Sequence, residues 1–153
     1  MTGQKQRIVV GVDGSSSSMA ALRWAIRQAK LTGGSVDAVT AWWYPSAYGW
    51  APVDDSGLDL EGDAKAALTE ALNKVSGLEP DIHVRPLVTE GHPADVLLRA
   101  AKGADLLVVG SRGHGGFASA MLGSVSLNCV LHAHCPVLVL RDGHEGLRPA
   151  DRR

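Results

Sequence analysis

The sequence predicts a single α/β domain built on an open, five-stranded, parallel, doubly wound sheet, which is a Rossmann-like architecture. Short apolar runs alternate strictly with segments whose apolar residues recur every three or four positions, in the order β-α-β-α-β-α-β-α-β. The runs Arg7–Val12 and Leu106–Gly110 are almost continuously apolar, which is typical of parallel strands covered on both faces. We therefore expect one domain over residues 1–141 and a polar, frayed tail over residues 142–153.

The first part of the chain predicts a strand, a helix and a second strand. Arg7–Val12 stops at Asp13-Gly14, and the serines at 15–18 then offer N-cap hydroxyls to the next helix. Gly33-Gly34 ends this helix, because glycine adopts the left-handed conformation of a helix cap at little cost. The apolar face of the helix consists of Met19, Leu22, Ala25, Ile26 and Ala29. Ser35–Ala41 is the second predicted strand.

A long aromatic loop separates the second strand from the second helix. Trp42–Gly57 has no clean period and contains two prolines and two glycines, so we expect a loop with local aromatic packing. Asp59–Ser76 has apolar residues at three- and four-residue spacing, which predicts a helix, and Gly77 is expected to cap it.

The remaining elements complete the alternation. Pro86 lies inside the third predicted strand, Ile82–Thr89, and proline favours an edge or a bulge because it has no N–H to donate. The later elements are a helix from Pro93 to Lys102, the strand Leu106–Gly110, a helix over Gly123–His132 and a last strand over Val137–Leu140. The last strand is short and apolar, and an open edge of this kind favours pairing with a second copy of the chain.

Composition and charge argue against several classes of partner. The 153 residues carry a formal net charge of −1, with 45% apolar and 20% charged residues, as in ordinary globular domains. No run of Lys or Arg is present, so neither nucleic acid nor a membrane surface is expected as a partner. No apolar segment is long enough to span a membrane, and the first residues lead into a strand rather than a signal peptide.

Cys129 and Cys135 form neither a CxxC motif nor a disulfide framework, so we expect a reducing, cytoplasmic location. Two buried small hydrophobes and a redox switch are the alternatives for these cysteines.

A glycine-rich pattern in the second half predicts an anion site. Parallel strands present their carboxyl ends at one edge of the sheet, and ligands bind there at the point where the strand order reverses. Two glycine-rich turns, 11–14 and 110–116, follow predicted strands and should face one crevice. Gly110 is followed by Gly113 and, after nine intervening residues, by Gly123-Ser124 at a helix start, so glycine backbone and free helix amides can approach a phosphate. The side chains able to add contacts are those of Arg112, His114, Ser124 and Ser126.

Simpler interpretations stay open for these residues. Glycine-rich loops also form tight turns without a ligand, and Asp13 can cap the helix that follows it without excluding a ligand role. Gly113-x-Gly115-x-x-Ala118 mimics a dinucleotide fingerprint, but no helix starts at once and no acidic residue lies about 20 positions further on. A Walker-type loop is excluded because the chain has no Gly-Lys-Ser/Thr.

The spacing G-x2-G-x9-G-[ST], preceded by IVVGVDGS and followed by HAHCPVLVLR, resembles the universal stress protein family over Arg7–Arg141. The resemblance implies an adenine nucleotide alpha hydrolase-like fold, ATP as the cofactor with Mg²⁺ left open, and a homodimer paired through Val137–Leu140. It implies that Asp13 and Gly11 contact the nucleotide, Asp13 through its acidic side chain, and that the backbone of Ala41 contacts the edge of the adenine. Trp42-Trp43-Tyr44, which follow Ala41, could form a wall of the adenine pocket. The other nucleotide contacts that it implies are Gly110, Ser111, Arg112, Gly113, His114, Gly115, Gly116, Gly123, Ser124, Val125 and Ser126.

The expected function is that of an ATP-binding stress protein that works as a nucleotide-dependent switch or sensor. At most slow ATP hydrolysis is expected, because no lysine comes from the loop and Asp13 is the only acidic candidate in the predicted crevice. One alternative is a protein-interaction module of the same fold that binds no nucleotide and uses the aromatic loop as its contact surface. An adenylyl-transferring enzyme is the third hypothesis. A protein partner of unknown identity is compatible with the first two.

Overall fold

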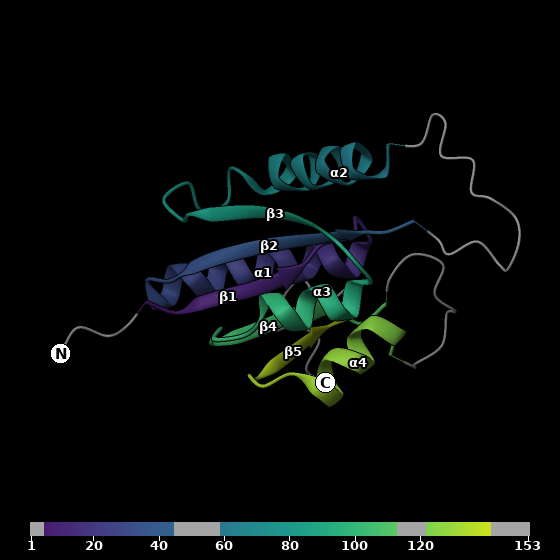
Figure 1. The fold of residues 1–153 in the computed structure, drawn as a ribbon. Coiled ribbons are helices and arrows are strands. Elements are labelled where there is room, and N and C mark those ends of the chain that lie inside the picture. Colours follow the sequence, from purple (N-terminus) through teal and green to yellow (C-terminus); the bar gives the residue numbers. More distant parts are fainter. Residues whose placement is uncertain (1–4, 45–58, 113–121, 142–153) are drawn as a thin grey trace, which may run out of the picture.

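A computed structural model describes residues 5–44, 59–112 and 122–141 of the chain. Within these ranges five strands alternate with four helices, as the sequence predicts (Figure 1). The elements are β1 (Arg7–Gly11), α1 (Ser16–Thr32), β2 (Ser35–Trp42), α2 (Leu60–Val75), β3 (Val84–Glu90), α3 (Pro93–Ala100), β4 (Leu106–Gly110), α4 (Ser124–His132) and β5 (Val137–Leu140). Most of the predicted aromatic loop and the predicted tail from Asp142 lie outside the described residues.

β1 lies at the centre of the sheet. The strand order is β3-β2-β1-β4-β5, and all neighbouring strands run parallel. The chain builds outward from β1 to β3 and then returns to place β4 on the other side of β1, so the strand order reverses between β1 and β4. β3 is an edge strand, as Pro86 predicts, and Pro86 pairs with Ala38 of β2 in the ladder.

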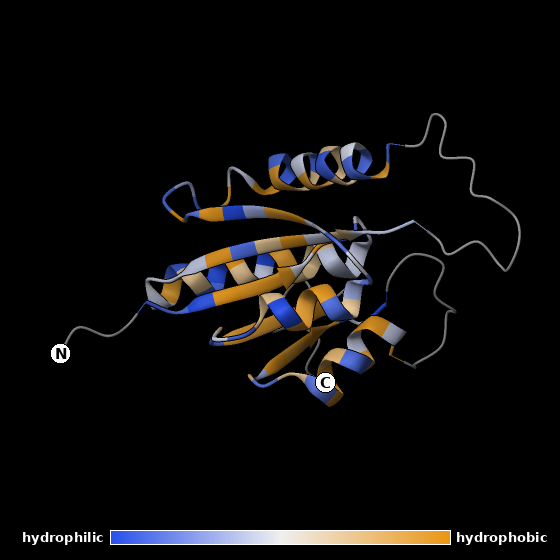
Figure 2. Cartoon of the chain, viewed as in Figure 1, coloured by the Kyte–Doolittle hydropathy of each residue, from blue (hydrophilic) through white to orange (hydrophobic). Residues whose placement is uncertain are grey.

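Helices cover both faces of the sheet. Successive residues of a strand point to opposite faces, so Ile8 and Val10 of β1 enter one core and Val9 enters the other. The first core is shared with α1 and α2, and the second with α3 and α4. Hydrophobic colouring accordingly runs along the strands between these layers, while hydrophilic residues alternate along the helices (Figure 2). This is the doubly wound arrangement expected from the sequence.

The ends of α1 follow the predicted cap chemistry. The side chain of Ser15 accepts a hydrogen bond from the backbone N–H of Ser18 at 3.3 Å and caps the first turn. Gly33 ends the helix in the left-handed region, with φ at 69°. Local sequence signals therefore determine where this helix begins and ends.

The expected cap at Gly77 is wrong. Asp59 caps the first turn of α2, which ends at Val75, and its C-cap is Ser76, whose hydroxyl donates to the carbonyl of Asn73 at 3.0 Å. Gly77 does not adopt the left-handed conformation. The hydroxyl of Ser76 satisfies a carbonyl of the last turn, so the helix needs no glycine cap.

A buried carboxylate connects three strands near their amino ends. Asp37 of β2 accepts hydrogen bonds from Arg7 Nη1 at 3.0 Å and from Arg85 Nε and Nη2 at 3.1 and 2.9 Å. Arg7 also donates to the carbonyls of Ala100 and Lys102 after α3. Burial alone raises the pKa of Asp37, but the hydrogen bonds and charges of the two arginines outweigh it and lower this pKa overall.

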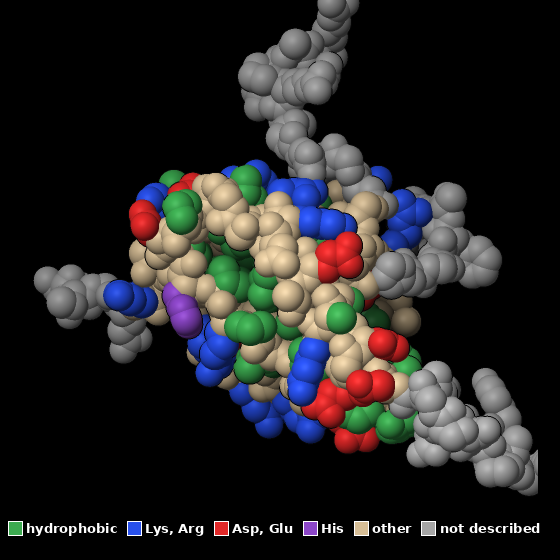
Figure 3. All heavy atoms as spheres, turned by 90° about the horizontal axis from the view of Figure 1, so that it is seen from above, with side chains coloured by type: hydrophobic (Ala, Val, Ile, Leu, Met, Phe, Trp, Pro, Cys, Tyr) green, Lys and Arg blue, Asp and Glu red, His purple; other side chains and the backbone are tan. Residues whose placement is uncertain are grey.

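The surface shows no large single-signed region on the face drawn in Figure 3. Both Lys or Arg and Asp or Glu side chains occur there, around a central group of hydrophobic side chains. Among the helices that the structure describes, none has both the length and the apolar character needed to cross a membrane.

Candidate functional site

A cavity of about 870 Å³ lies at the carboxyl ends of β1, β2 and β4. Small-molecule sites usually measure about 300–1,000 Å³. The cavity includes the point where the strand order reverses, which is where open α/β sheets bind ligands. The first turns of α2, α3 and α4 also line it. The cavity therefore has both the location and the size of a ligand site.

The start of α4 forms one end of the cavity. Gly123 is the N-cap, with extended backbone (φ −65°, ψ 162°), and no side chain caps the first turn. The buried hydroxyl of Ser126 lies within hydrogen-bond distance of the carbonyls of Ser111 (3.2 Å) and Gly123 (3.0 Å), while the N–H of Gly123 donates to Ser111 at 2.7 Å. These bonds fix the helix start against β4. They leave the uncapped first-turn amides, together with Ser124, at the cavity wall, where the helix dipole favours an anion.

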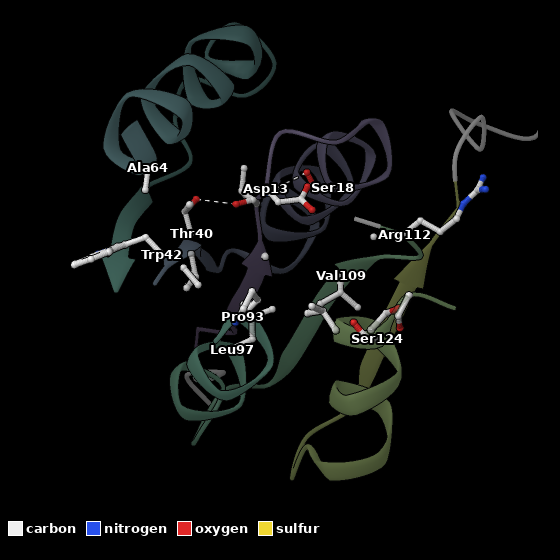
Figure 4. A pocket seen from close by; sticks show the side chains of 18 of the residues that line it. Asp13, Ser18, Thr40, Trp42, Ala64, Pro93, Leu97, Val109, Arg112 and Ser124 are labelled. Carbon is white, nitrogen blue, oxygen red and sulfur yellow. Dashed lines mark hydrogen bonds between the residues drawn. The ribbon is translucent and has the colours of Figure 1, made fainter. Parts of the chain in front are cut away.

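The first residues of the glycine-rich loop are attached to α1. The buried hydroxyl of Ser17 donates to the carbonyl of Arg112 at 2.6 Å. A Cβ at Gly110 would lie 2.7 Å from the carbonyl carbon of Ser17 and 2.8 Å from the amide nitrogen of Ser18. Gly110 is therefore required for the close approach of α1 to β4, whether or not a ligand binds. In Figure 4 the guanidinium of Arg112 points away from the other labelled side chains.

Asp13 supports the cap of α1 rather than forming it. Its carboxylate accepts from the backbone N–H of Ser15 at 2.8 Å and from the Ser15 hydroxyl, and Ser15 in turn caps the helix. The Asp13 side chain is exposed and lies at the cavity wall. The sequence left open whether Asp13 caps α1, and the structure gives this cap to Ser15. The Asp13 carboxylate accepts from the capping hydroxyl and also lines the cavity.

The carboxyl ends of β1 and β2 are connected beneath the cavity. The buried hydroxyl of Thr40 donates to the carbonyl of Val12 at 2.8 Å, and the N–H of Val12 donates to the carbonyl of Val39 at 2.8 Å. Ala41 follows at the cavity wall, and a Cβ at Gly11 would contact the side chain of Leu97 of α3 at 2.9 Å. The floor of the cavity is therefore rigid and mostly apolar at this point.

Aromatic side chains form the cavity wall at the end of β2. Trp42 and Trp43 both line the cavity. The ring of Trp42 lies 5.6 Å from that of Tyr44 in an edge arrangement, and the ring of Trp43 lies 5.3 Å from that of His92. In Figure 4, Trp42 and Ala64 of α2 lie at one end of the cavity, whereas Ser124 and Arg112 lie at the other. The cavity therefore has an aromatic end and an end with free helix amides.

The structure brings most of the predicted site residues together. Those that line the cavity are Gly11, Asp13, Ala41, Gly110, Arg112, Gly123, Ser124, Val125 and Ser126. Ser111 is buried, is not among the lining residues, and contributes its backbone carbonyl to the loop and to α4. Gly113, His114, Gly115 and Gly116 lie outside the described residues.

Sequence reasoning missed the contributions of α2 and α3 to the cavity wall. The additional lining side chains from these helices are Leu60, Asp63, Ala64, Pro93 and Leu97. The i, i+4 spacing of Leu60 and Ala64 indicates one helical face, but it does not indicate which strand end that face covers. Thr40 was missed as well, although it directly precedes the predicted contact residue Ala41.

The two cysteines differ in environment. Cys129 of α4 is fully buried, and burial, with a smaller contribution from Cys135, raises its pKa to about 11. Cys135 is only partly buried, and burial raises its pKa as well, against the opposing effects of a backbone hydrogen bond from Leu107 and the charge of Arg7. The burial of Cys129 therefore favours the first of the two alternatives, a small buried hydrophobe, and Cys135 fits that alternative only in part.

Together these features define a class of protein: an open, doubly wound α/β domain with a ligand-sized cavity at the switch point of its sheet. The model of the Universal stress protein family matches residues 5–141. The chain belongs to this family, as the resemblance in the sequence implies.

Relatives and solved structures support this assignment. The chain is 36% identical over 149 residues to Universal stress protein Rv1996 of Mycobacterium tuberculosis, in a match that covers 94% of this chain and 46% of the relative. It thus spans about half the length of the curated relatives it matches. The universal stress protein UspA from Lactobacillus plantarum has a TM-score of 0.76 at 26% identity, over 92% of this chain and 100% of that chain. A crystal structure of a universal stress protein in complex with cAMP has a TM-score of 0.69 at 28% identity, over 91% of this chain and 98% of that chain.

Proposed function

We propose that the chain binds ATP in the cavity at the carboxyl ends of its strands and works as a nucleotide-dependent switch or sensor. The observation that carries this proposal is the division of the cavity into two chemically different ends. One end has the uncapped first turn of α4, and the other has two indole rings beside apolar side chains. A ligand with a charged phosphate group and a flat apolar base matches this division. The structural relative in complex with cAMP supports a nucleotide as the ligand.

Each part of the cavity has a defined role in this proposal. The amides of the first turn of α4 and the Ser124 hydroxyl would donate to phosphate oxygens, and the dipole of α4 would favour their charge. Ser17 and Ser126 would keep the loop and α4 in place through their bonds to backbone carbonyls. The backbone of Ala41 would meet the edge of the base. Gly123 places no side chain between the phosphates and the helix start.

The same residues favour a switch over an efficient enzyme. Among the described lining residues no lysine occurs, and the acidic side chains are those of Asp13 and Asp63. Within the described residues no group of three His, Cys, Asp or Glu side chains is arranged to hold a metal ion. A Mg²⁺ ion bound with ATP would therefore take most of its ligands from the phosphates and water, as Mg²⁺ commonly does. We expect at most slow hydrolysis, which steady-state release of phosphate or AMP would measure.

Thermal unfolding with a matched pair of variants tests the site. At an ATP concentration of 100 times Kd, binding to the native state adds about 2.7 kcal/mol to the free energy of unfolding, so the melting temperature should rise. Gly123→Asp places a carboxylate where phosphate should bind, and this variant should lose the rise. Gly77→Asp introduces the same side chain after α2, where nothing lies within 4 Å of a Cβ, and it should keep the rise. An equal ATP response in both variants would exclude α4 as the phosphate site.

The proposal includes a homodimer paired through β5 and a cytoplasmic location. β5 is an edge of the sheet, and Leu127, Val130 and Leu131 of the neighbouring α4 are exposed apolar side chains. The unpaired cysteines are compatible with a reducing compartment.

Light scattering with two variants of β5 tests the dimer. The carbonyls of Pro136 and Leu140 accept from the backbone N–H groups of Leu107 and Ser111 on the β4 side, so the N–H of Val139 points to the open side of β5. Val139→Pro removes that donor and should yield monomers, whereas Val139→Ala keeps the N–H and should stay dimeric. A dimeric Val139→Pro variant would place the interface elsewhere.

A further inference from the structure

Trp42, the last residue of β2, and Trp43, which follows it, place two indole rings on different sides of the strand end. Val36 and Ala38 pack in the core with α1 and α2, whereas Val39 and Ala41 pack against the core with α3 and α4. Trp42 continues the first series by the alternation of a strand. The ring of Trp43 contacts His92, directly before α3, and is therefore on the α3 side. Both indoles line the cavity, and so does Ala41, which directly precedes them in the chain.

Each indole contacts another aromatic ring. The ring of Trp43 lies 5.3 Å from that of His92 and is tilted by 40°, and the ring of Trp42 lies 5.6 Å from that of Tyr44 at 86°. The backbone at this point is also fixed, because the N–H of Gly91 donates to the carbonyl of Trp42 at 2.8 Å. Aromatic side chains with few torsions that are already oriented lose little conformational freedom when a ligand binds.

The chemistry of this end of the cavity favours stacking over hydrogen bonding. The lining residues from α2 and α3 are Leu60, Asp63, Ala64, Pro93 and Leu97, and all of them except Asp63 are apolar. Every nucleobase has a π-face, so stacking on an indole does not depend on the hydrogen-bonding edge of the base. The stacking area, however, is larger for a bicyclic purine than for a single-ring pyrimidine.

We propose that Trp42 and Trp43 form an aromatic bracket that selects a bicyclic purine base by stacking at the end of the cavity remote from α4. This proposal rests on nucleotide binding in the cavity and adds the side chains that decide which bases are accepted. The bracket distinguishes purines from pyrimidines, and it contributes nothing to the affinity for a bare polyphosphate.

Binding measurements on single-residue variants test the bracket. Dissociation constants are measured for ATP, GTP, CTP and inorganic tripolyphosphate with the wild type, Trp43→Leu and Trp43→Phe. Trp43→Leu keeps an apolar side chain but removes the π-face, so ATP and GTP should each bind about 5- to 150-fold more weakly. Tripolyphosphate should bind equally to all three proteins, and Trp43→Phe should recover most of the affinity for ATP. Trp24→Phe is the matched control, because Trp24 of α1 packs against the core and does not line the cavity.

The outcomes separate the bracket from the proposed function. Wild-type protein that binds ATP as weakly as CTP, or Trp43→Leu that binds ATP as tightly as the wild type, would overturn the bracket and leave nucleotide binding intact. Wild-type protein that binds none of the nucleotides would overturn both. A melting curve without ligand shows whether Trp43→Leu is folded, and if it is not, Trp42→Leu with the same ligands decides between the outcomes.

Discussion

The substitution Gly110→Ala tests whether this glycine is set by the packing of α1. A methyl group at residue 110 would lie 2.7 Å from the carbonyl carbon of Ser17 and 2.8 Å from the amide nitrogen of Ser18. Both atoms belong to the backbone, so no side-chain rotation relieves the overlap, and the first turn of α1 must move away from β4. Movement of Ser17 also stretches its 2.6 Å bond to the carbonyl of Arg112. Overpacking of this kind costs about 1–3 kcal/mol.

Thermal unfolding without ligand measures this cost. For a chain of this length, 1 kcal/mol corresponds to roughly 2–4 °C, so Gly110→Ala should lower the melting temperature by roughly 2–12 °C. Gly77→Ala is the control, because its Cβ meets nothing within 4 Å and its φ is not in the left-handed region. Its melting temperature should differ little from that of the wild type. Equal melting temperatures for the two variants would refute the packing role of Gly110.

Three further predictions concern the scaffold. Asp37→Asn should cost about 1–3 kcal/mol in urea unfolding at pH 7, since it removes the charge that two arginines bind. The lowered pKa of Asp37 stabilises the fold above its unfolded pKa, so the difference between variant and wild type should shrink as the pH falls below about 4. Cys135 should react with iodoacetamide before Cys129, whose pKa is raised to about 11, and site-resolved mass spectrometry at pH 8 should show this order. Ser15→Ala should cost about 1 kcal/mol in urea unfolding through loss of the cap of α1, and an unchanged midpoint would contradict that role.

The fold was predictable because its signals are local. Continuous apolar runs marked the central strands, Pro86 marked an edge strand, and Gly33 marked the end of α1. The prediction failed at Gly77, where the hydroxyl of Ser76 satisfies a carbonyl that a glycine cap was expected to serve. A competing side-chain bond of this kind depends on geometry that sequence spacing does not specify.

The candidate site was predictable where the chain leaves a strand or begins a helix. Asp13, Ala41 and Gly123 lie at strand ends or at a helix start, and their positions followed from the order of elements. The apolar wall from α2 and α3 depends on how those helices pack over the sheet, which periodicity alone does not give. Gly110 was predicted as a ligand contact, but its lack of a side chain is also required by packing, because the backbone of α1 lies too close to leave room for a Cβ.

Equilibrium dialysis against labelled ATP and Mg²⁺ tests whether the cavity binds ATP. We expect saturable binding of one ATP per chain in the micromolar range, retained in Gly77→Asp and lost in Gly123→Asp. Absence of saturable binding to folded wild-type protein at millimolar ATP would contradict it.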